Sequence, residues 1–115
     1  SILLERLIAR LSGLRGRLYT VIGRKTFSSA LLDALSLARI GATLVGEPTG
    51  GKPSHHGEVK MFPLPRSGLI VMYSTKYFPD PDHNTDSLLP DVPVELTYAD
   101  WAAGRDPVLD AILKR

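Results

Sequence analysis

The sequence predicts an α/β fold built on a strand-helix-strand unit, and three patterns support this prediction. Residues 17–23 and 42–46 are short apolar runs typical of buried strands. Residues 27–39, between them, carry apolar side chains at helical spacing. Because both connections to this helix are tight, the two strands are expected to be parallel neighbours joined by a right-handed crossover.

Composition and charge are those of a globular protein of one domain. The chain has 115 residues, of which 43% are hydrophobic and 23% are charged, enough for one modest core. Its formal charge is +2 and its pI about 9.1, but the basic residues are scattered, so nucleic acid is not an expected partner. No apolar run reaches membrane-spanning length, so no membrane span is expected. The absence of cysteine excludes disulfides and leaves cytoplasmic and periplasmic or secreted locations open.

The two N-terminal helices are predicted from their apolar stripes. Residues 2–14 have apolar side chains near helical spacing with charged residues opposite, and this amphipathic helix is expected to end around Ser12 and Gly13. The helix of residues 27–39 is expected to begin with Thr26 as its N-cap. Its apolar stripe is expected to comprise Phe27, Ala30, Leu31, Ala34, Leu35 and Ala38.

A loop rich in glycine and proline follows the second strand. Residues 47–57 are not expected to hold regular structure. Gly50 and Gly51 permit close approach of the backbone to a ligand, so both are expected to bind substrate. The loop is not a Walker phosphate loop, because Pro53 rather than serine or threonine follows Lys52.

The next residues predict a β-hairpin. Residues 58–64 and 69–77 read as two strands, and the turn sequence at residues 65–68 joins them. The following stretch, residues 79–90, is predicted to be a polar loop that forms no packed element.

The C-terminal part predicts an edge segment and two short helices. Residues 91–96 are expected to be extended, with prolines that suit an edge. Thr97 is expected to cap a helix through Trp101, and Asp106 followed by Pro107 to begin a last helix. In that last helix the residues expected to face the core are Val108, Leu109, Ile112 and Leu113.

Ser28 lies at the start of the helix that follows the first buried strand. From its position alone, such a serine is most simply a helix N-cap. A hydroxyl at a strand-to-helix turn is also where a serine nucleophile would lie, since the N-terminal amides of a helix stabilise an oxyanion. Ligand sites in strand-helix-strand units lie beyond the carboxyl ends of the strands, where Ser28 and the glycine loop both fall.

Five motifs follow one another along the chain, and their order is more specific than any one of them. They are GRKTFSSA at residues 23–30, ATLVGEPTGGKP at 42–53, STKYF at 74–78, PDVPVELT at 90–97 and AGRDPVLDAIL at 103–113. Together they resemble the C-terminal-processing, or tail-specific, serine peptidase family, in the branch of the tricorn core protease and the interphotoreceptor retinoid-binding protein domains. The resemblance implies a crotonase-like (ClpP-like) α/β fold, of which this chain would be the C-terminal half, with the N-terminal half of the domain missing.

The resemblance also implies roles in peptide-bond hydrolysis. Ser28 takes the place of the family nucleophile, and the backbone N–H of Ser29 would be one oxyanion donor. Lys52 matches the general-base lysine of the Ser-Lys members, a role that requires burial or a nearby cation to lower its pKa. Three residues after the nucleophile, where the family commonly has an acid, this chain has Leu31.

The tricorn-like members use a different base scheme. They take a histidine from the upstream half of the domain and a carboxylate from the loop before the Pro-Asp pair. His55 and His56 do not match that histidine, and they are expected to be loop or strand-start residues without a metal, since adjacent residues of a strand face opposite ways. Asp86 is the nearest candidate for the carboxylate and Asp82 the next, with a solvated loop acid as the simpler interpretation of both.

Hypotheses from different functional classes follow. In the first, the chain is part of a serine-type peptidase that acts on a peptide or protein without a cofactor, and the fragment alone is inactive. In the second, it is a non-catalytic ligand-binding or assembly module that retains the peptidase fold. An α/β interaction domain that binds another chain is a third. Because unpaired strand edges tend to pair, self-association of the chain is expected.

Overall fold

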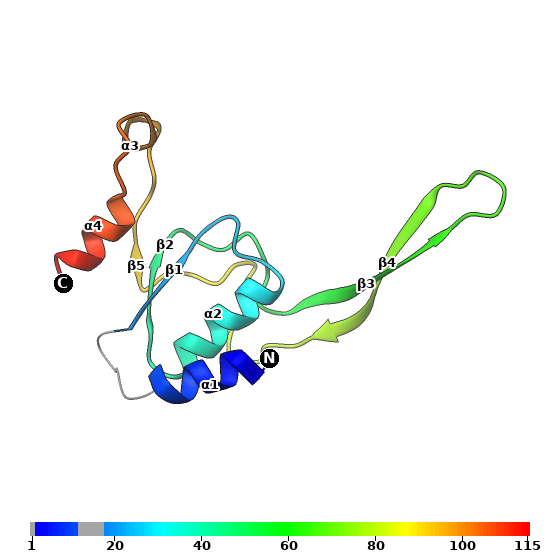
Figure 1. Cartoon of the computed structure of the whole chain (residues 1–115), viewed down its shortest axis with the longest axis horizontal. Helices are drawn as coiled ribbons and strands as arrows, with labels where there is room; N and C mark the ends of the chain where they lie inside the picture. Colours follow the sequence, from blue (N-terminus) through cyan, green and yellow to red (C-terminus); the bar gives the residue numbers. More distant parts are fainter. Residues whose placement is uncertain (1, 12–17) are drawn as a thin grey trace.

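Figure 1 shows a computed structural model of the chain. The chain forms a mixed α/β body from which a long hairpin projects. The structure describes residues 2–11 and 18–115, with the backbone alone for residues 2–5. Helices and strands alternate in the first half of the chain, and two short helices follow the last strand. The predicted α/β class is confirmed.

A three-stranded parallel sheet of order β1-β2-β5 organises the body. β1 (Tyr19–Ile22) pairs with β2 (Thr43–Gly46), and β2 pairs with the short β5 (Val92–Pro93). The helix α2 (Ser29–Arg39) connects β1 to β2, so the predicted parallel strand-helix-strand unit is confirmed. Pro93 lacks an N–H group and lies on an edge strand, where proline is tolerated.

The core lies between α2 and this sheet. Leu31, Ala34 and Leu35 are buried together because residues three and four apart share one face of a helix. The strands and the loop before β5 supply the rest of the core, with Ile22, Leu44 and Leu88. Phe27, predicted to belong to the same stripe, is instead 62% exposed, because α2 begins at Ser29 and Phe27 lies in the turn before it.

The polar loop of residues 79–90 is more closely packed than its composition predicts. Leu88 is 2% exposed and joins the core, and its N–H donates to the Thr49 hydroxyl at 2.9 Å. Asp91, directly after this loop, accepts a hydrogen bond from the Leu44 N–H of β2 at 2.8 Å. The predicted loop is confirmed, since residues 79–90 form no helix or strand, but one of its side chains packs in the core and Thr49, distant in sequence, satisfies one of its polar groups.

The strands β3 (His55–Pro63) and β4 (Ile70–Phe78) form the predicted antiparallel hairpin. β3 begins at His55 rather than at residue 58, so the end of the predicted loop is strand instead. We call residues 55–78 the arm, which extends from the body in Figure 1. Because of the arm, the radius of gyration is 17.5 Å, whereas about 13 Å is typical of a compact domain of this length.

Two of the remaining helices begin as their capping residues predict. α1 (Ile2–Leu11) lies within the predicted N-terminal helix, whose last residues, 12–14, lie outside the described part. α3 (Tyr98–Ala102) begins with a capping box, in which the Thr97 hydroxyl accepts from the Asp100 N–H at 3.1 Å. α4 (Pro107–Leu113) has Asp106 as its N-cap. Among the described residues, no helix combines the length and apolar character needed to cross a membrane.

The prediction that four residues of α4 face the core is wrong for two of them. Leu109 is 50% exposed and Leu113 is 75% exposed, whereas Val108 and Ile112 are half-buried. A helix of two turns that packs against one neighbour, here β2, can bury only one face. Val108 and Ile112, four residues apart, occupy that face and leave the other two leucines outside.

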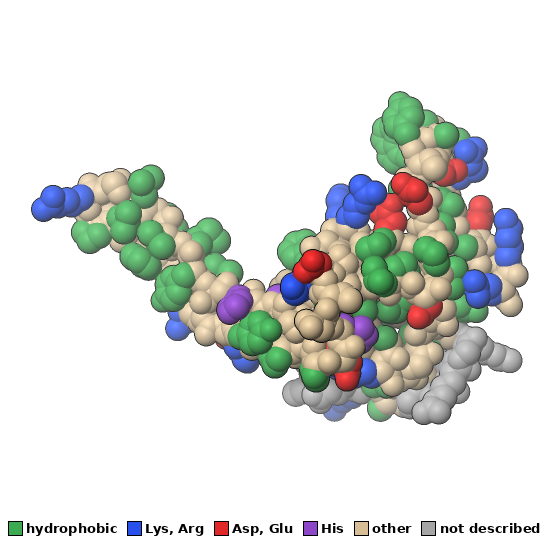
Figure 2. All heavy atoms as spheres, turned by 180° about the vertical axis from the view of Figure 1, so that it is seen from behind, with side chains coloured by type: hydrophobic (Ala, Val, Ile, Leu, Met, Phe, Trp, Pro, Cys, Tyr) green, Lys and Arg blue, Asp and Glu red, His purple; other side chains and the backbone are tan. Residues whose placement is uncertain are grey.

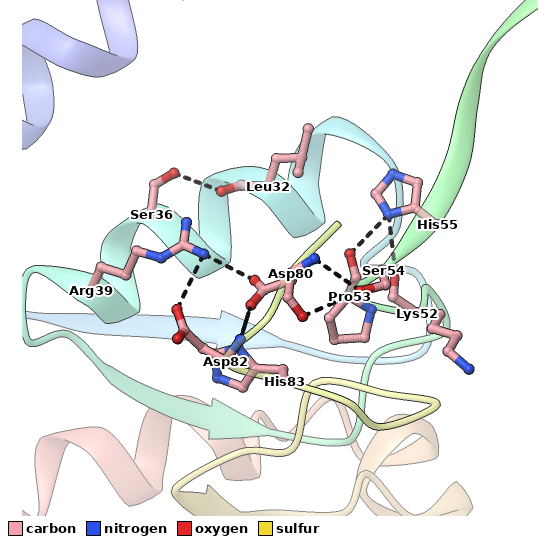
Figure 3. A network of polar contacts seen from close by, with 10 residues as sticks. All are labelled: Leu32, Ser36, Arg39, Lys52, Pro53, Ser54, His55, Asp80, Asp82 and His83. Carbon is pink, nitrogen blue, oxygen red and sulfur yellow. Dashed lines mark hydrogen bonds and ion pairs between the residues drawn. The ribbon is translucent and has the colours of Figure 1, made fainter. Parts of the chain in front are cut away.

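Asp80, at the base of the arm, is buried in a network of polar contacts (Figure 3). Arg39 Nη2 donates to Oδ2 at 3.1 Å, the Asp82 N–H donates to Oδ1 at 3.0 Å, and His83 Nδ1 lies 3.2 Å from Oδ1. The Asp80 N–H donates to Ser54 Oγ at 2.9 Å, across the base of the arm. Burial opposes ionisation, but the contacts with His83, the Asp82 N–H and the Arg39 charge hold the pKa of Asp80 below its ordinary value.

Replacing a core leucine should destabilise the chain far more than replacing an exposed one. We expect Leu35→Ala to lower the free energy of unfolding by about 2–5 kcal/mol, because the side chain is buried and leaves a cavity. Leu113→Ala, at an exposed position, should change it by about 0.5 kcal/mol or less. Urea unfolding followed by circular dichroism measures both, and equal losses would contradict this location of the core.

The Asp80 network should make stability fall in acid. Since the folded-state pKa is lowered, the contribution is complete above the ordinary pKa of 3.8 and is lost as the pH falls through the folded-state value. We expect Asp80→Asn to destabilise the protein by about 1–3 kcal/mol at neutral pH, and the difference from wild type to shrink below pH 3.8. Asp33→Asn, at an exposed carboxylate outside the network, is the matched control. A pH-independent difference in urea unfolding would refute the assignment.

Candidate functional site

Ser28 adopts an unusual backbone conformation in the turn between β1 and α2. Its φ is 54° and its ψ is −128°, in a region that costs a residue other than glycine about 1–3 kcal/mol. Its carbonyl accepts hydrogen bonds from the N–H groups of Leu31 and Leu32, at 3.1 and 3.2 Å. Its hydroxyl makes no capping hydrogen bond. Ser28 thus occupies the N-cap position without acting as a side-chain cap.

The prediction that Thr26 caps this helix is wrong. The helix begins at Ser29, so Thr26 is too far from the free N–H groups of the first turn. The Thr26 hydroxyl instead accepts a hydrogen bond from the Gly23 N–H at 3.1 Å, and the Thr26 N–H donates to the Gly23 carbonyl at 2.8 Å. These two bonds close a tight turn directly before Ser28.

The glycine loop packs against this turn. The Gly51 N–H donates to the Thr26 carbonyl at 3.0 Å. A Cβ atom at Gly50 would lie 2.0 Å from the Arg24 carbonyl oxygen, and one at Gly51 would lie 2.9 Å from the Phe27 Cα. Both positions therefore require glycine because of the backbone of the turn, whether or not they also contact a substrate.

A pocket of about 680 Å³ lies between the start of α2, the glycine loop and the first residues of the arm. It brings together four residues predicted for the site: Ser28, Ser29, Gly51 and Lys52. The residues that line the rest of it include Phe27, Leu32, His55, His56, Val59 and Phe78. Its size and largely apolar wall are typical of pockets that hold small ligands or side chains of a bound chain.

A second pocket, of about 470 Å³, lies at the carboxyl ends of β2 and β5. Its lining includes Arg24 and Glu47, whose Nε and Oε2 atoms are 3.4 Å apart. Ser28 and Lys52 do not line it. The larger pocket is therefore the one that contains the predicted catalytic residues Ser28, Ser29 and Lys52.

Lys52 and Asp86 form an ion pair at the edge of this site. Lys52 Nζ lies 2.8 Å from Asp86 Oδ1, and the two side chains are 50% and 95% exposed. The hydrogen bond from Lys52, together with its charge, lowers the pKa of Asp86, and the same pair raises the pKa of Lys52 above 10.5. A lysine can act as a general base at neutral pH only if its pKa is lowered. In this arrangement Lys52 is therefore a protonated cation.

His55 and His56 also line the pocket, although the sequence does not predict either of them for the site. His55 is a strand-start residue, as predicted, because β3 begins there. His55 Nδ1 lies 3.0 Å from the Lys52 carbonyl and 3.1 Å from the Pro53 carbonyl. These acceptors favour the tautomer with hydrogen on Nδ1, which leaves Nε2 as an acceptor. Their position directly after the glycine loop is the sequence signal that points to the site.

No base contacts Ser28 within the described part of the chain. Its hydroxyl has no hydrogen-bond partner among residues 2–11 and 18–115. The same residues contain no cluster of three histidine or carboxylate side chains that could hold a metal ion. The site thus combines a serine, a free helix N-terminus and a pocket, and its lysine is paired with Asp86 rather than with the serine.

Comparison of the chain with models of protein families gives no match, and comparison with curated protein sequences gives none either. The function is therefore inferred from the geometry around Ser28, together with the order of the sequence motifs.

Removing Asp86 should lower the pKa of Lys52. We expect Asp86→Asn to return that pKa toward its ordinary value of 10.5, because the hydrogen bond and the charge of Asp86 together raise it. Titration of the Lys52 side chain by NMR measures the shift. Asp82→Asn, which changes a carboxylate that pairs with Arg39 instead, should leave the pKa of Lys52 unchanged. An equal shift of the pKa of Lys52 in both variants would contradict the ion pair between Lys52 and Asp86.

Proposed function

We propose that this chain carries the nucleophile and part of the substrate pocket of a serine-type peptidase, with Ser28 as nucleophile and a peptide or protein as substrate. The main observation that supports this proposal is the strained backbone of Ser28, with its positive φ. Strain of this kind persists only where its surroundings enforce it, and it is concentrated at active sites. A serine on a strained strand-to-helix turn is the arrangement of a nucleophile elbow.

The fold proposed for the complete domain is crotonase-like. The parallel unit of β1, α2 and β2, the hairpin after the glycine loop and the order of the five motifs support it. In this proposal the chain is the C-terminal part of the domain, and an upstream half completes the site.

The proposed reaction follows from the position of Ser28. Its Oγ attacks the carbonyl carbon of a peptide bond and gives its proton to a base. The oxyanion accepts a hydrogen bond from the Ser29 N–H, which is free because the first N–H groups of a helix have no intrahelical acceptor. The tetrahedral intermediate then expels the amine, which takes a proton, and water hydrolyses the remaining acyl ester.

The base is Lys52 or a residue outside this chain. Lys52 lines the pocket of Ser28, but it can accept a proton only after its contact with Asp86 opens and its pKa falls. Burial by an upstream half of the domain would act in that direction. His55 is a further candidate, because it lines the same pocket and its Nε2 is left as an acceptor. The chain alone is accordingly expected to be inactive.

A non-catalytic binding or assembly module is the second candidate function. Two observations favour it: the Ser28 hydroxyl has no partner among the described residues, and Lys52 is held as a cation by Asp86. In such a module the same pocket would bind an apolar ligand or chain segment without cleaving it.

Labelling with a fluorophosphonate probe separates the two functions. In a parent protein that includes the upstream half, we expect strong labelling that Ser28→Ala reduces to background, since the probe bonds to an activated serine. Ser29→Ala is the matched control and should retain labelling, because Ser29 acts through its backbone N–H. In-gel fluorescence measures the signal, and circular dichroism checks that each variant is folded.

Two results would overturn the peptidase proposal. The first is equal labelling of the parent protein and its Ser28→Ala variant. The second is a folded parent protein without any labelling, which would instead favour the binding module. The chain of 115 residues alone is expected to remain unlabelled.

A further inference from the structure

The arm exposes apolar side chains on both of its faces. Residues directly opposite each other in an antiparallel pair share a face, and Met61 faces Met72 while Phe62 faces Val71 on the other side. Met61 and Met72 are 66% and 65% exposed, and Phe62 is 45% exposed. Hydrophobic side chains accordingly run along the arm in Figure 2. An isolated two-stranded hairpin is marginally stable in water, so we expect this arm to pack against another surface.

The exposed area of the chain is large enough for a stable interface. A folded monomer of 12.6 kDa exposes about 6,200 Å². This chain exposes 8440 Å², an excess of roughly 2,200 Å², and standard interfaces bury about 800 Å² on each partner. The excess is therefore more than one interface of ordinary size requires.

The C-terminal segment presents a second apolar surface. We call residues 94–113, which contain α3 and α4, the C-terminal module. Tyr98 and Trp101 are 80% and 67% exposed, with ring centroids 5.7 Å apart, and Leu113 is 75% exposed. Exposed aromatic pairs of this kind provide the central contacts of many protein interfaces.

The two surfaces carry opposite charge. The arm contains the basic residues Lys60, Arg66 and Lys76 and the acidic residue Glu58. The C-terminal module contains the acidic residues Glu95, Asp100, Asp106 and Asp110 and the basic residue Arg105, and Lys114 and Arg115 follow it at the chain end. Lys60, Arg66, Glu95 and Asp110 have no ion-pair partner within the part of the chain that the structure describes. These charges are thus free to pair with another molecule.

The arm cannot reach the C-terminal module of its own chain. Figure 1 shows the two at opposite sides of the body along the longest axis, which extends 59 Å. Two chains placed side by side in opposite directions would bring each arm to the C-terminal module of the other. Such a contact is reciprocal and closes as a two-fold dimer.

We propose that the partner of the arm is a second copy of this chain, with each arm docked on the C-terminal module of the other copy. The dimer buries the apolar faces of both surfaces and pairs Lys60 and Arg66 with carboxylates such as Glu95 and Asp110. It does not depend on Ser28 or on catalysis, so it stands or falls separately from the proposed function.

Reversing charge on one surface at a time tests this dimer. We expect the wild-type chain to sediment as a dimer at high concentration and as a monomer on dilution. Lys60→Glu with Arg66→Glu, and separately Glu95→Lys with Asp110→Lys, should each weaken the dimer by roughly tenfold or more, because each homodimer then contains two contacts between like charges. An equimolar mixture of the two variants should regain the dimer, since both contacts of the heterodimer join opposite charges.

The controls reverse exposed charges outside both surfaces. Lys25→Glu and Asp33→Lys should dimerise like the wild type, and circular dichroism verifies that every variant is folded. The proposal is overturned if the wild-type chain is monomeric at all concentrations, or if the mixed variants do not associate. A monomer that binds an upstream half of the domain would assign the arm to that half instead.

Discussion

The packing of the glycine loop on the turn before α2 is the constraint on which the site depends. A hydrogen bond joins Gly51 to the Thr26 carbonyl at 3.0 Å, and Gly50 approaches the Arg24 carbonyl too closely for any side chain. Ser28, in the turn that this contact fixes, has a backbone that would relax in a free turn. Because Lys52 follows Gly51 directly, the same contact also holds the lysine at the pocket.

Much of the fold could be predicted because local patterns encode it. The parallel pair β1 and β2, the hairpin and the caps at Thr97 and Asp106 depend on residues close together in the sequence. What the sequence did not show depends on contacts between distant segments. Leu88 is buried only because its loop crosses the core, and Leu113 is exposed because α4 packs by one face alone.

The candidate site also has features that local sequence predicts and features that depend on distant contacts. The place of Ser28 at a strand-to-helix turn can be predicted, whereas its φ of 54° depends on the loop packed against the turn. The ion pair between Lys52 and Asp86 joins residues 34 positions apart, so it requires the complete fold. The start of a strand at His55 agrees with the prediction, but its place in the pocket depends on how β3 lies relative to the start of α2 and could not be predicted.

The Asp80 network has a mechanical consequence. Ser54 and Asp80 fasten the two strands of the arm at their base, and Arg39 fastens Asp80 to the last turn of α2. Ser28 precedes the first turn of the same helix, roughly 16 Å away along its axis. The base of the arm is therefore connected directly to the last turn of α2. A displacement at the base of the arm would therefore act on Asp80 and, through Arg39, on the helix that follows Ser28.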